Sequence, residues 1–287
     1  MPDGSERKAR PRLGLVAYLN SRPIGFGLLS GRQRGLFEVV EDIPSALADS
    51  LARGELDLAL IPSVEVALAA TAGREAAIVP GIAIAARGAA ESVLLFRRVP
   101  WVEIRSIAVD LSSRTSAALM KILLRRRLRP GAPDPEFVPS RPDLPRMLRR
   151  CDAALLIGDR ALLAGRRLPA EIQGLEVNDL GAEWMAMTGL PFVFAVWAGP
   201  VRRDSPRIVA ALQDSLEEGL TSIPRIARQW ASGDPAVEEI IRRYLFGAMH
   251  YRLGHEELRG LETYYRLLAE EGFIPQPPAL RFHPGPG

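Results

Sequence analysis

Hydroxyl side chains are concentrated in one segment, DLSSRTS at residues 110–116. It follows the apolar run SIAV and precedes the helical pattern AALMKILLRRR, so its serines are candidates for the N-cap of a helix. A helix N-terminus presents unpaired N–H groups and the positive end of the helix dipole, and both favour a carboxylate or a phosphate. Capping needs one hydroxyl, whereas this segment has four hydroxyls and an arginine in five positions. We therefore predict that Ser113, Arg114, Thr115 and Ser116 bind an anionic substrate.

A second group of candidates stands where the first apolar run ends, in the sequence VAYLNSRP. Tyr18 and Asn20 follow the strand-like LGLVA, and Pro23 forces a new element to begin directly after them. An asparagine at the exit of a buried strand is either a turn residue or an uncharged hydrogen-bonding group at the mouth of a cleft. Its amide both donates and accepts, and it does not titrate.

Three further polar residues occupy the ends of apolar runs. Ser63 follows DLALIP and caps the next helical pattern, Ser92 opens the run SVLLF, and Asp159 follows LLIG and opens another helical pattern. Open α/β sheets bind their ligands outside the carboxyl ends of the strands. We therefore expect these residues to reach the same cleft as Asn20, with plain N-capping as the alternative for Asp159.

Several classes of chemistry lack their usual residues in this chain. The sequence has no CxxC, no glycine-rich dinucleotide or nucleotide loop and no nucleophile elbow. All the histidines fall in the C-terminal region, outside the strand-end motifs: His250, His255 and His283. Zinc, nicotinamide, nucleotide and acyl-enzyme chemistry are therefore poorly supported, and we expect neither a metal nor a cofactor.

The elements that must position these residues alternate between short apolar runs and helical patterns, which predicts an α/β fold with mostly parallel sheets. Strands are expected at 12–18, 37–42, 57–61, 81–86, 91–97, 106–110, 135–138, 152–157, 175–178 and 192–197. Helices are expected at 44–53, 63–70, 115–128, 142–150, 159–164, 205–232, 235–246 and 255–271. The C-terminal third is therefore predicted to be helical.

The order of these elements predicts two lobes. The segments 91–97 and 191–198 are β-rich and flank a self-contained α/β block, so we expect them to be hinge strands. The block at 98–190 would form the second lobe, inserted into a first lobe made of 12–95 and 199–275. Residues 1–11 and 276–287 are expected to be flexible tails. Ligands bind preferentially between such lobes.

The composition is that of a globular protein of 287 residues, with 47% hydrophobic and 25% charged residues and a net charge of +3. The basic run RRRLR at 125–129 ends a helical pattern, which favours a solvated helix end over a nucleic-acid site. No segment offers the roughly 18 apolar residues that a membrane span needs, and the N-terminus lacks the apolar core of a signal peptide. The single cysteine, Cys151, fits a reducing compartment. We expect a cytoplasmic protein without a nucleic-acid or membrane partner.

The motif series as a whole resembles one known family. The stretches AYLNSRP, GELDLALIPSVE, ESVLLF, SSRTSAAL, CDAALLIGD, DLGAEWMAMTGLPFVFAVWA and GLETYYRLLAEEGFI are similar to those of the chorismate dehydratases of menaquinone biosynthesis by the futalosine route. The likeness runs from about residue 12 to residue 275. That family has the fold of type 2 periplasmic binding proteins.

The resemblance implies a hydro-lyase that converts chorismate to 3-[(1-carboxyvinyl)oxy]benzoate without a metal or nucleotide. Chorismate carries two carboxylates, and the helix starts at 63 and at 112–116 could each receive one. Asn20 is then the catalytic residue that orients the substrate and stabilises charge at the elimination centre. The base is either a substrate carboxylate or Asp159. The expected substrate-binding residues are Tyr18, Ser63, Ser92, Ser113, Arg114, Thr115, Ser116 and Asp159.

Two alternatives stay open at this point. A relative of the same fold acts on cyclic dehypoxanthine futalosine and looks to depend on a histidine near the N-terminal strand end, whereas the nearest histidine here in sequence is His250. A non-catalytic solute-binding protein for small anions would need export or a lipid anchor, and the chain shows no signal for either. The sequence leaves the oligomeric state and the extent of lobe closure open.

Overall fold

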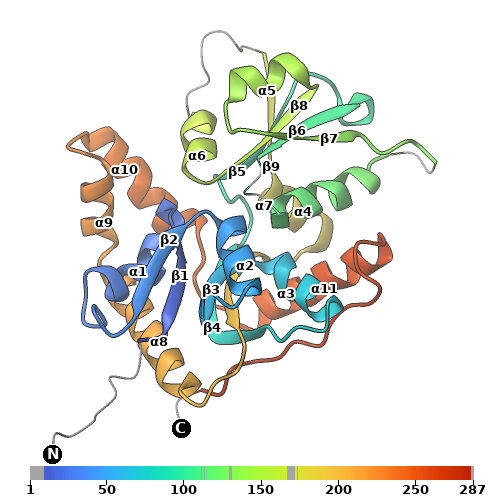
Figure 1. Cartoon of the computed structure of the whole chain (residues 1–287). Helices are drawn as coiled ribbons and strands as arrows, with labels where there is room; N and C mark the ends of the chain where they lie inside the picture. Colours follow the sequence, from blue (N-terminus) through green and yellow to red (C-terminus); the bar gives the residue numbers. More distant parts are fainter. Residues whose placement is uncertain are drawn as a thin grey trace, which may run out of the picture.

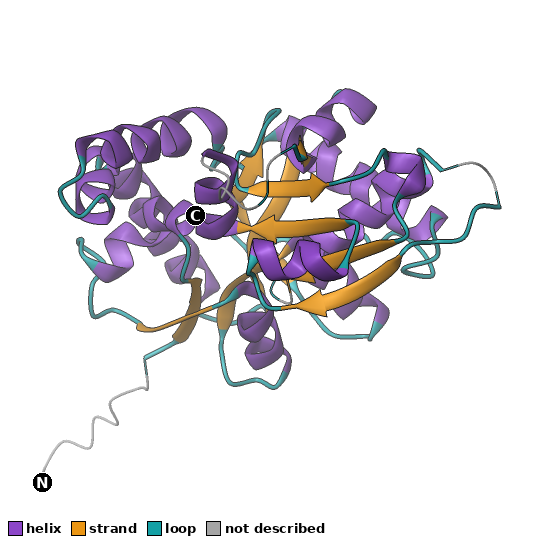
Figure 2. Ribbon diagram, turned by 90° about the horizontal axis from the view of Figure 1, so that it is seen from above, coloured by secondary structure: helices purple, strands orange, loops and turns teal. Residues whose placement is uncertain are grey.

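The computed structural model describes residues 10–110, 112, 114–128, 131–166, 172 and 174–285. Over these ranges the chain forms two lobes, each built on its own five-stranded sheet (Figure 1). Seen from above, the strands lie in the middle of the molecule with helices on both sides (Figure 2). The α/β class and the helical C-terminal part agree with the prediction.

The first lobe contains the sheet of order β2-β1-β3-β10-β4. Its strands are β1 (Arg12–Val16), β2 (Glu38–Asp42), β3 (Leu58–Pro62), β4 (Ala77–Ala86) and β10 (Phe192–Gly199). β1 runs parallel to β2 and β3, whereas β10 runs antiparallel to β3 and β4. All of β3 is buried, as expected for a central strand that is covered on both faces.

Helices from both ends of the chain surround this sheet. The N-terminal ones are α1 (Arg22–Leu29), α2 (Pro44–Ala52) and α3 (Ser63–Thr71). The C-terminal ones are α8 (Ser205–Thr221), α9 (Ile223–Trp230), α10 (Pro235–Arg243) and α11 (His255–Glu270). A short 3-10 turn (Leu19–Ser21) follows β1, and a π-helical turn (Tyr244–Ala248) follows α10. The ends of the chain therefore complete one lobe together.

The second lobe contains the sheet of order β7-β6-β8-β5-β9. Its strands are β5 (Val93–Arg97), β6 (Ser106–Asp110), β7 (Glu136–Ser140), β8 (Ala153–Ile157) and β9 (Glu176–Asp179). Its helices are α4 (Arg114–Arg125), α5 (Leu144–Arg150), α6 (Gly158–Arg166) and α7 (Leu180–Thr188), and a 3-10 turn spans Trp101–Glu103. β6 runs parallel to β7 and β8, whereas β5 runs antiparallel to β8 and β9. Both sheets thus combine a parallel part with one antiparallel strand next to a crossing.

The crossings differ in detail from the predicted hinge. The segments 91–97 and 191–198 were expected to be shared between the lobes. Instead, β5 pairs with β8 and β9 of the second sheet, and β10 pairs with β3 and β4 of the first. The chain crosses in the short segments 87–92 and 189–191 that precede these strands. Apolar content identified the two strands, but it could not assign them to a sheet, because both strands are buried in either case.

The first crossing is fixed by Asp179, the N-cap of α7. Its carboxylate accepts the N–H groups of Ala90 at 2.9 Å and Glu91 at 2.6 Å, as well as that of Gly181 at 2.9 Å. Glu91 has a φ of +58°, a backbone conformation that is uncommon for a residue with a side chain. The bonds to Asp179 hold this turn against the start of α7.

The C-terminal tail also departs from the expectation that 276–287 is flexible. Ile78 of β4 donates its N–H to the carbonyl of Arg281 at 2.8 Å, and His283 donates its N–H to the carbonyl of Ile78 at 2.9 Å. The His283 ring is buried and lies 3.0 Å from the hydroxyl of Ser205. Residues 281–283 therefore extend the first sheet locally, along an edge that the apolar pattern did not reveal. Of the predicted N-terminal tail, residues 1–9 lie outside the described part of the chain.

The helix α1, which was not predicted, packs very closely against α8. A Cβ added at Gly27 would lie 2.6 Å from the Cα of Ser215, and one added at Gly219 would lie 1.7 Å from the carbonyl oxygen of Pro23. Glycine is therefore required at this contact, although it is unfavourable in an isolated helix. This packing anchors the segment that leads from Asn20 into the first lobe.

Candidate active site

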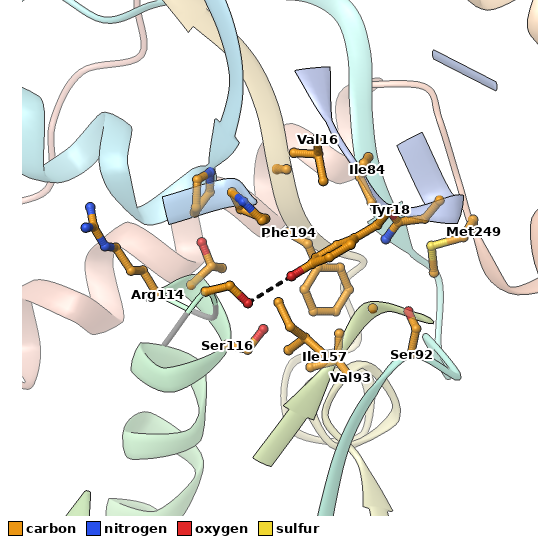
Figure 3. Close-up of a pocket in the computed structure, with 17 residues that line it drawn as sticks. Val16, Tyr18, Ile84, Ser92, Val93, Arg114, Ser116, Ile157, Phe194 and Met249 are labelled. Carbon is orange, nitrogen blue, oxygen red and sulfur yellow. Dashed lines mark hydrogen bonds between the residues drawn. The ribbon is translucent and has the colours of Figure 1, made fainter. Parts of the chain in front are cut away.

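A cavity lies between the two lobes, at the ends of strands from both sheets (Figure 3). Its polar lining side chains are an amide, a phenol, several hydroxyls and one guanidinium. They are Tyr18, Asn20, Ser92, Ser112, Arg114, Thr115 and Ser116. Its apolar lining residues are Val16, Pro44, Pro62, Ile84, Val93, Ile157, Phe194, Ala195 and Met249, with Gly158 between them. The lobes thus bring together groups that are far apart in the sequence.

Asn20 lies in the 3-10 turn that follows β1, partly buried in the cavity wall. Its Oδ1 atom is shielded from solvent and has no hydrogen-bond partner among the described residues. A buried amide oxygen without a partner costs about 1–3 kcal/mol of stability. Such a cost is tolerated when the group is used for binding or catalysis.

Tyr18 is linked to the second lobe through Ser112. The two hydroxyl oxygens are 2.9 Å apart, a bond that Figure 3 shows as a dashed line. Ser112 donates its one hydroxyl proton to Asp110 Oδ1 at 2.8 Å, so the Tyr18 phenol is the donor to Ser112. Burial, more than any other cause, raises the pKa of Tyr18 above its ordinary value of 10.0. The phenol therefore stays protonated at neutral pH.

Ser92 stands where the chain enters β5, and a buried tyrosine orients it. Tyr244, which begins the π-helical turn, donates its hydroxyl to Ser92 Oγ at 2.8 Å. Ser92 in turn donates to the carbonyl of Ala90 at 3.3 Å, which is a long bond. Burial raises the pKa of Tyr244, so its phenol is a permanent donor.

The start of α4 forms a further part of the wall. Thr115 and Ser116 are 3% and 5% exposed and both line the cavity. Thr115 Oγ1 accepts the N–H of Val64 at 3.2 Å, so the first turns of α3 and α4 meet across the lobes. The first N–H groups of a helix have no acceptor within that helix, so they are suited to bind an anion here.

The guanidinium of Arg114 is already paired with carboxylates of the first lobe. Its Nη1 donates to Glu65 at 3.0 Å, and its Nη2 donates to both carboxylate oxygens of Asp49 at 2.9 Å. Asp49 is in α2 and Glu65 in α3, so this ion pair joins the first lobe to α4. Arg114 lines the cavity, but its charge is neutralised by these carboxylates.

The comparison with known proteins identifies the family. A sequence model described as menaquinone biosynthesis matches residues 11–270. The chain is also 31% identical to a chorismate dehydratase of Thermus thermophilus over 270 residues, which are 89% of this chain and 94% of that protein. The chain belongs to the menaquinone biosynthesis family.

Solved structures share the fold at low sequence identity. A protein of Archaeoglobus fulgidus has a TM-score of 0.69 and 17% identity, covering 92% of this chain and 98% of its own. The periplasmic aliphatic sulphonate binding protein of Escherichia coli has a TM-score of 0.60 and 16% identity, covering 94% of this chain and 95% of its own. This menaquinone biosynthesis family member therefore has the predicted fold of type 2 periplasmic binding proteins.

Two residues predicted for the site of this family member do not line the cavity. Ser63 is fully buried and donates its hydroxyl to the carbonyl of Val193 at 2.7 Å, so it is not placed to receive a carboxylate. The Asp159 carboxylate accepts the N–H of Leu19 at 2.9 Å and is likewise not among the lining residues. Ser113 lies outside the described residues.

Other lining residues were not predicted. Ser112 belongs to the hydroxyl-rich segment at 110–116, and its neighbours were chosen in its place. Phe194 lies in β10, and its ring packs edge-on against that of Phe192, with 4.7 Å between the two ring centroids. Met249 follows the π-helical turn, and no pattern in the sequence points to it.

Neither a metal site nor a membrane-spanning helix is found in the described part of this family member. No group of three or more histidine, cysteine, aspartate or glutamate side chains is arranged to hold a metal ion in those ranges. None of the helices described there is both long and apolar enough to cross a bilayer.

Proposed function

We propose that this chain is a chorismate dehydratase, a cytoplasmic hydro-lyase of menaquinone biosynthesis by the futalosine route. The family match and the name of the Thermus thermophilus relative support this activity. The product would be 3-[(1-carboxyvinyl)oxy]benzoate. The cytoplasmic location rests on the single cysteine, Cys151, which is a free thiol in the structure.

The cavity suits a substrate with two carboxylates. Among the described residues, its lining contains hydroxyls, an amide and the start of α4, but no aspartate or glutamate side chain. A dianion therefore meets donors at the cavity wall, while the carboxylates of Asp110 and Asp159 lie behind it and accept bonds from Ser112 and from the N–H of Leu19. The hydroxyls of Ser116 and Thr115, with the N–H groups of the first turn of α4, would bind one carboxylate. The apolar lining, including Phe194, would pack against the ring and exclude water.

The reaction breaks the C–H bond at the ether-bearing ring carbon and the C–O bond of the neighbouring ring hydroxyl. The electron pair of the C–H bond becomes the new ring double bond, and the hydroxyl leaves with a proton as water. The ring becomes aromatic, so the step is strongly downhill, and the protein must mainly orient the substrate and stabilise the developing charge.

The lining offers no side chain that is suited to act as the base. Of its described titratable groups, Tyr18 is held protonated and Arg114 is always charged. We therefore assign proton removal to the carboxylate on the substrate's own side chain. This assignment gives Asp159 no direct part in proton transfer.

The observation that carries the proposal is the buried, unpartnered amide oxygen of Asn20. It can accept a hydrogen bond from the ring hydroxyl, while the amide nitrogen donates to a substrate oxygen. Ser92, held by Tyr244, would supply a second donor close to the crossing between the lobes by exchanging its long bond to the Ala90 carbonyl for a substrate oxygen. Such preorganised donors stabilise the charge that develops on the leaving oxygen.

The test is direct. Purified protein treated with a chelator is incubated with chorismate, and the aromatic product is followed by its absorbance and mass. We expect complete conversion with release of one water per chorismate and no added metal or nucleotide. Tight binding of chorismate without turnover would overturn the enzymatic proposal. Turnover of cyclic dehypoxanthine futalosine in its place would assign the chain to the related activity.

A further inference from the structure

The second lobe holds the segment of Tyr18, Leu19 and Asn20 at three points. The Tyr18 hydroxyl bonds to Ser112 at 2.9 Å. The Tyr18 ring lies against Gly158, where an added Cβ would be 2.9 Å from the ring and where φ is +63°. The N–H of Leu19 donates to Asp159 Oδ1 at 2.9 Å. The turn that presents Asn20 belongs to the first lobe, where the Ser21 hydroxyl donates to the carbonyls of Val16 and Tyr18, and its first residues are held in addition by the second lobe.

The bond from Leu19 to Asp159 completes the 3-10 turn at residues 19–21. The first N–H groups of such a turn have no acceptor within the turn. The residue before the turn, Tyr18, makes no side-chain capping bond to them. The carboxylate of Asp159, at the start of α6, supplies the cap from the other lobe.

We propose that Asp159 is a positioning residue that fixes the amide of Asn20 only when the lobes are closed. In the open state Leu19 loses its cap, and the turn that carries Asn20 keeps only its bonds within the first lobe, those of Ser21. Closure on a substrate restores the cap one residue away from the catalytic amide. Substrate binding and assembly of the catalytic group are thereby coupled through one hydrogen bond.

This role differs from the three that the sequence suggested for Asp159, which are a plain N-cap, a substrate contact and a general base. Asp159 lies inside the first turn of α6, which begins at Gly158, so it is not the N-cap of that helix. A substrate contact would require Asp159 to line the cavity, and it does not. A general base would require a carboxylate, whereas capping requires only an oxygen acceptor. Asparagine has such an oxygen and nearly the same shape, so Asp159→Asn separates the two roles.

The experiment compares Asp159→Asn with Asp159→Ala. Its kinetic measurements rest on the proposed function, because they follow the turnover of chorismate. We expect the alanine variant to lose about ten- to a hundredfold in kcat, on the scale of one hydrogen bond to a charged group, with KM changed much less. We expect the asparagine variant to recover most of kcat. An asparagine variant as slow as the alanine variant, or a loss confined to KM, would overturn the proposal.

A second measurement is independent of turnover. Hydrogen exchange at the Leu19 amide should be slowed by chorismate or by the aromatic product in the wild type, and not in Asp159→Ala. Equal protection in both proteins would overturn the positioning role even if the enzyme is active. If the wild type binds chorismate without turnover, the proposed function fails while this measurement still decides the role of Asp159.

The matched control is Asp143→Ala in the same lobe. Asp143 also accepts a backbone N–H, that of Arg146 at 3.1 Å, but it caps α5 away from the cavity. Its loss should lower the melting temperature without slowing turnover. A fall in kcat in this variant equal to that in Asp159→Ala would show that any lost cap in the lobe has the same effect, and would overturn the proposal.

Discussion

At the scale of single residues, the cavity presents neutral donors and acceptors to a substrate with two negative charges. Asn20 is the centre of this arrangement, because its amide oxygen is buried without a partner among the described residues. Tyr18 and Ser92 are each oriented by a second hydroxyl, from Ser112 and Tyr244. In this closed arrangement of the lobes, the side chains proposed to touch substrate are therefore held in place.

Asn20→Asp is the sharpest test of this arrangement. The substitution keeps the shape and the turn propensity, but it removes two donors and adds a negative charge beside a dianion. We expect a near-normal melting temperature and a loss of at least about a hundredfold in kcat, the scale of one preorganised donor. Asn20→Ala should also be slow, without the added repulsion. A fully active Asn20→Asp protein would reduce Asn20 to a turn residue.

Tyr244→Phe tests whether the orientation of Ser92 matters. The change removes the hydroxyl that donates to Ser92 Oγ and that also interacts with the Asn20 side chain. The loss of one bond of about 1 kcal/mol predicts a roughly fivefold to tenfold lower kcat. Tyr265→Phe is the matched control, since its buried hydroxyl donates to the carbonyl of Ser63 at 2.7 Å and Tyr265 does not line the cavity. The control should lose stability and keep its kcat. Equal kinetic losses in both variants would argue for a general packing effect.

At the scale of elements, the starts of α3 and α4 look alike in sequence and differ in the structure. Both follow a strand and both begin with hydroxyl residues. At α3, Ser63 donates to Val193 and the N–H of Val64 donates to Thr115, so the first turn is used inside the protein. At α4, Ser116 faces the cavity. We infer that only the α4 start is available to a substrate carboxylate.

Ser116→Ala and Ser63→Ala test this difference. Ser116→Ala should raise KM about ten- to a hundredfold, because a hydrogen bond to a charged group is worth about 1.5–3 kcal/mol. Ser63→Ala should lower the melting temperature, because the Val193 carbonyl loses its donor, and should leave KM unchanged. If steady-state kinetics show a higher KM in Ser63→Ala and an unchanged KM in Ser116→Ala, the substrate carboxylate would be assigned to Ser63.

Most of the elements could be predicted, because apolar runs with turn residues at their ends are a local signal. The helices α1 and α7 were missed for a physical reason. The α1 sequence RPIGFGLL contains a proline and two glycines, which are poor helix formers, and its stability comes from close packing against α8. The α7 sequence LGAEWMAMT is apolar on most of its surface and lacks the usual spacing.

The candidate site was predictable where it uses strand ends, and not where it uses tertiary contacts. Asn20, Ser92 and the residues of the α4 start follow or precede apolar runs, so their position was visible. Tyr244 reaches Ser92 from a π-helical turn that no periodicity reveals. Ser63 and Asp159 have the same local pattern as true lining residues, and only the packing of the two lobes separates them.

At the scale of the whole molecule, the structure shows the lobes in contact around the cavity. Arg114 bridges α4 to Asp49 and Glu65, and Thr115 accepts the N–H of Val64. We infer that these bonds, with those of Tyr18 and Leu19, break when the lobes open, so that the structure corresponds to a closed state. Opening would then be governed by a few polar contacts.

Small-angle scattering can measure this equilibrium. We expect the radius of gyration of the free protein to exceed that of the complex with the aromatic product. Replacing Asp49 and Glu65 with alanine removes the acceptors of Arg114 without changing a lining residue. This variant should be more open when free and should have a higher KM, with kcat at saturation little changed. An identical radius of gyration in every state would show that the lobes do not open as rigid bodies.

The position of β10 between β3 and β4 also constrains how the chain can fold during synthesis. The strands of the second sheet, β5 to β9, leave the ribosome one after another, so that sheet can form while the chain is still growing. The first sheet lacks its connecting strand until residues 192–199 have been made. Until then β3 and β4 expose unpaired edges, which are templates for pairing with another chain. A released chain that ends before residue 192 would therefore combine all the strands of the second sheet with an incomplete and aggregation-prone first sheet.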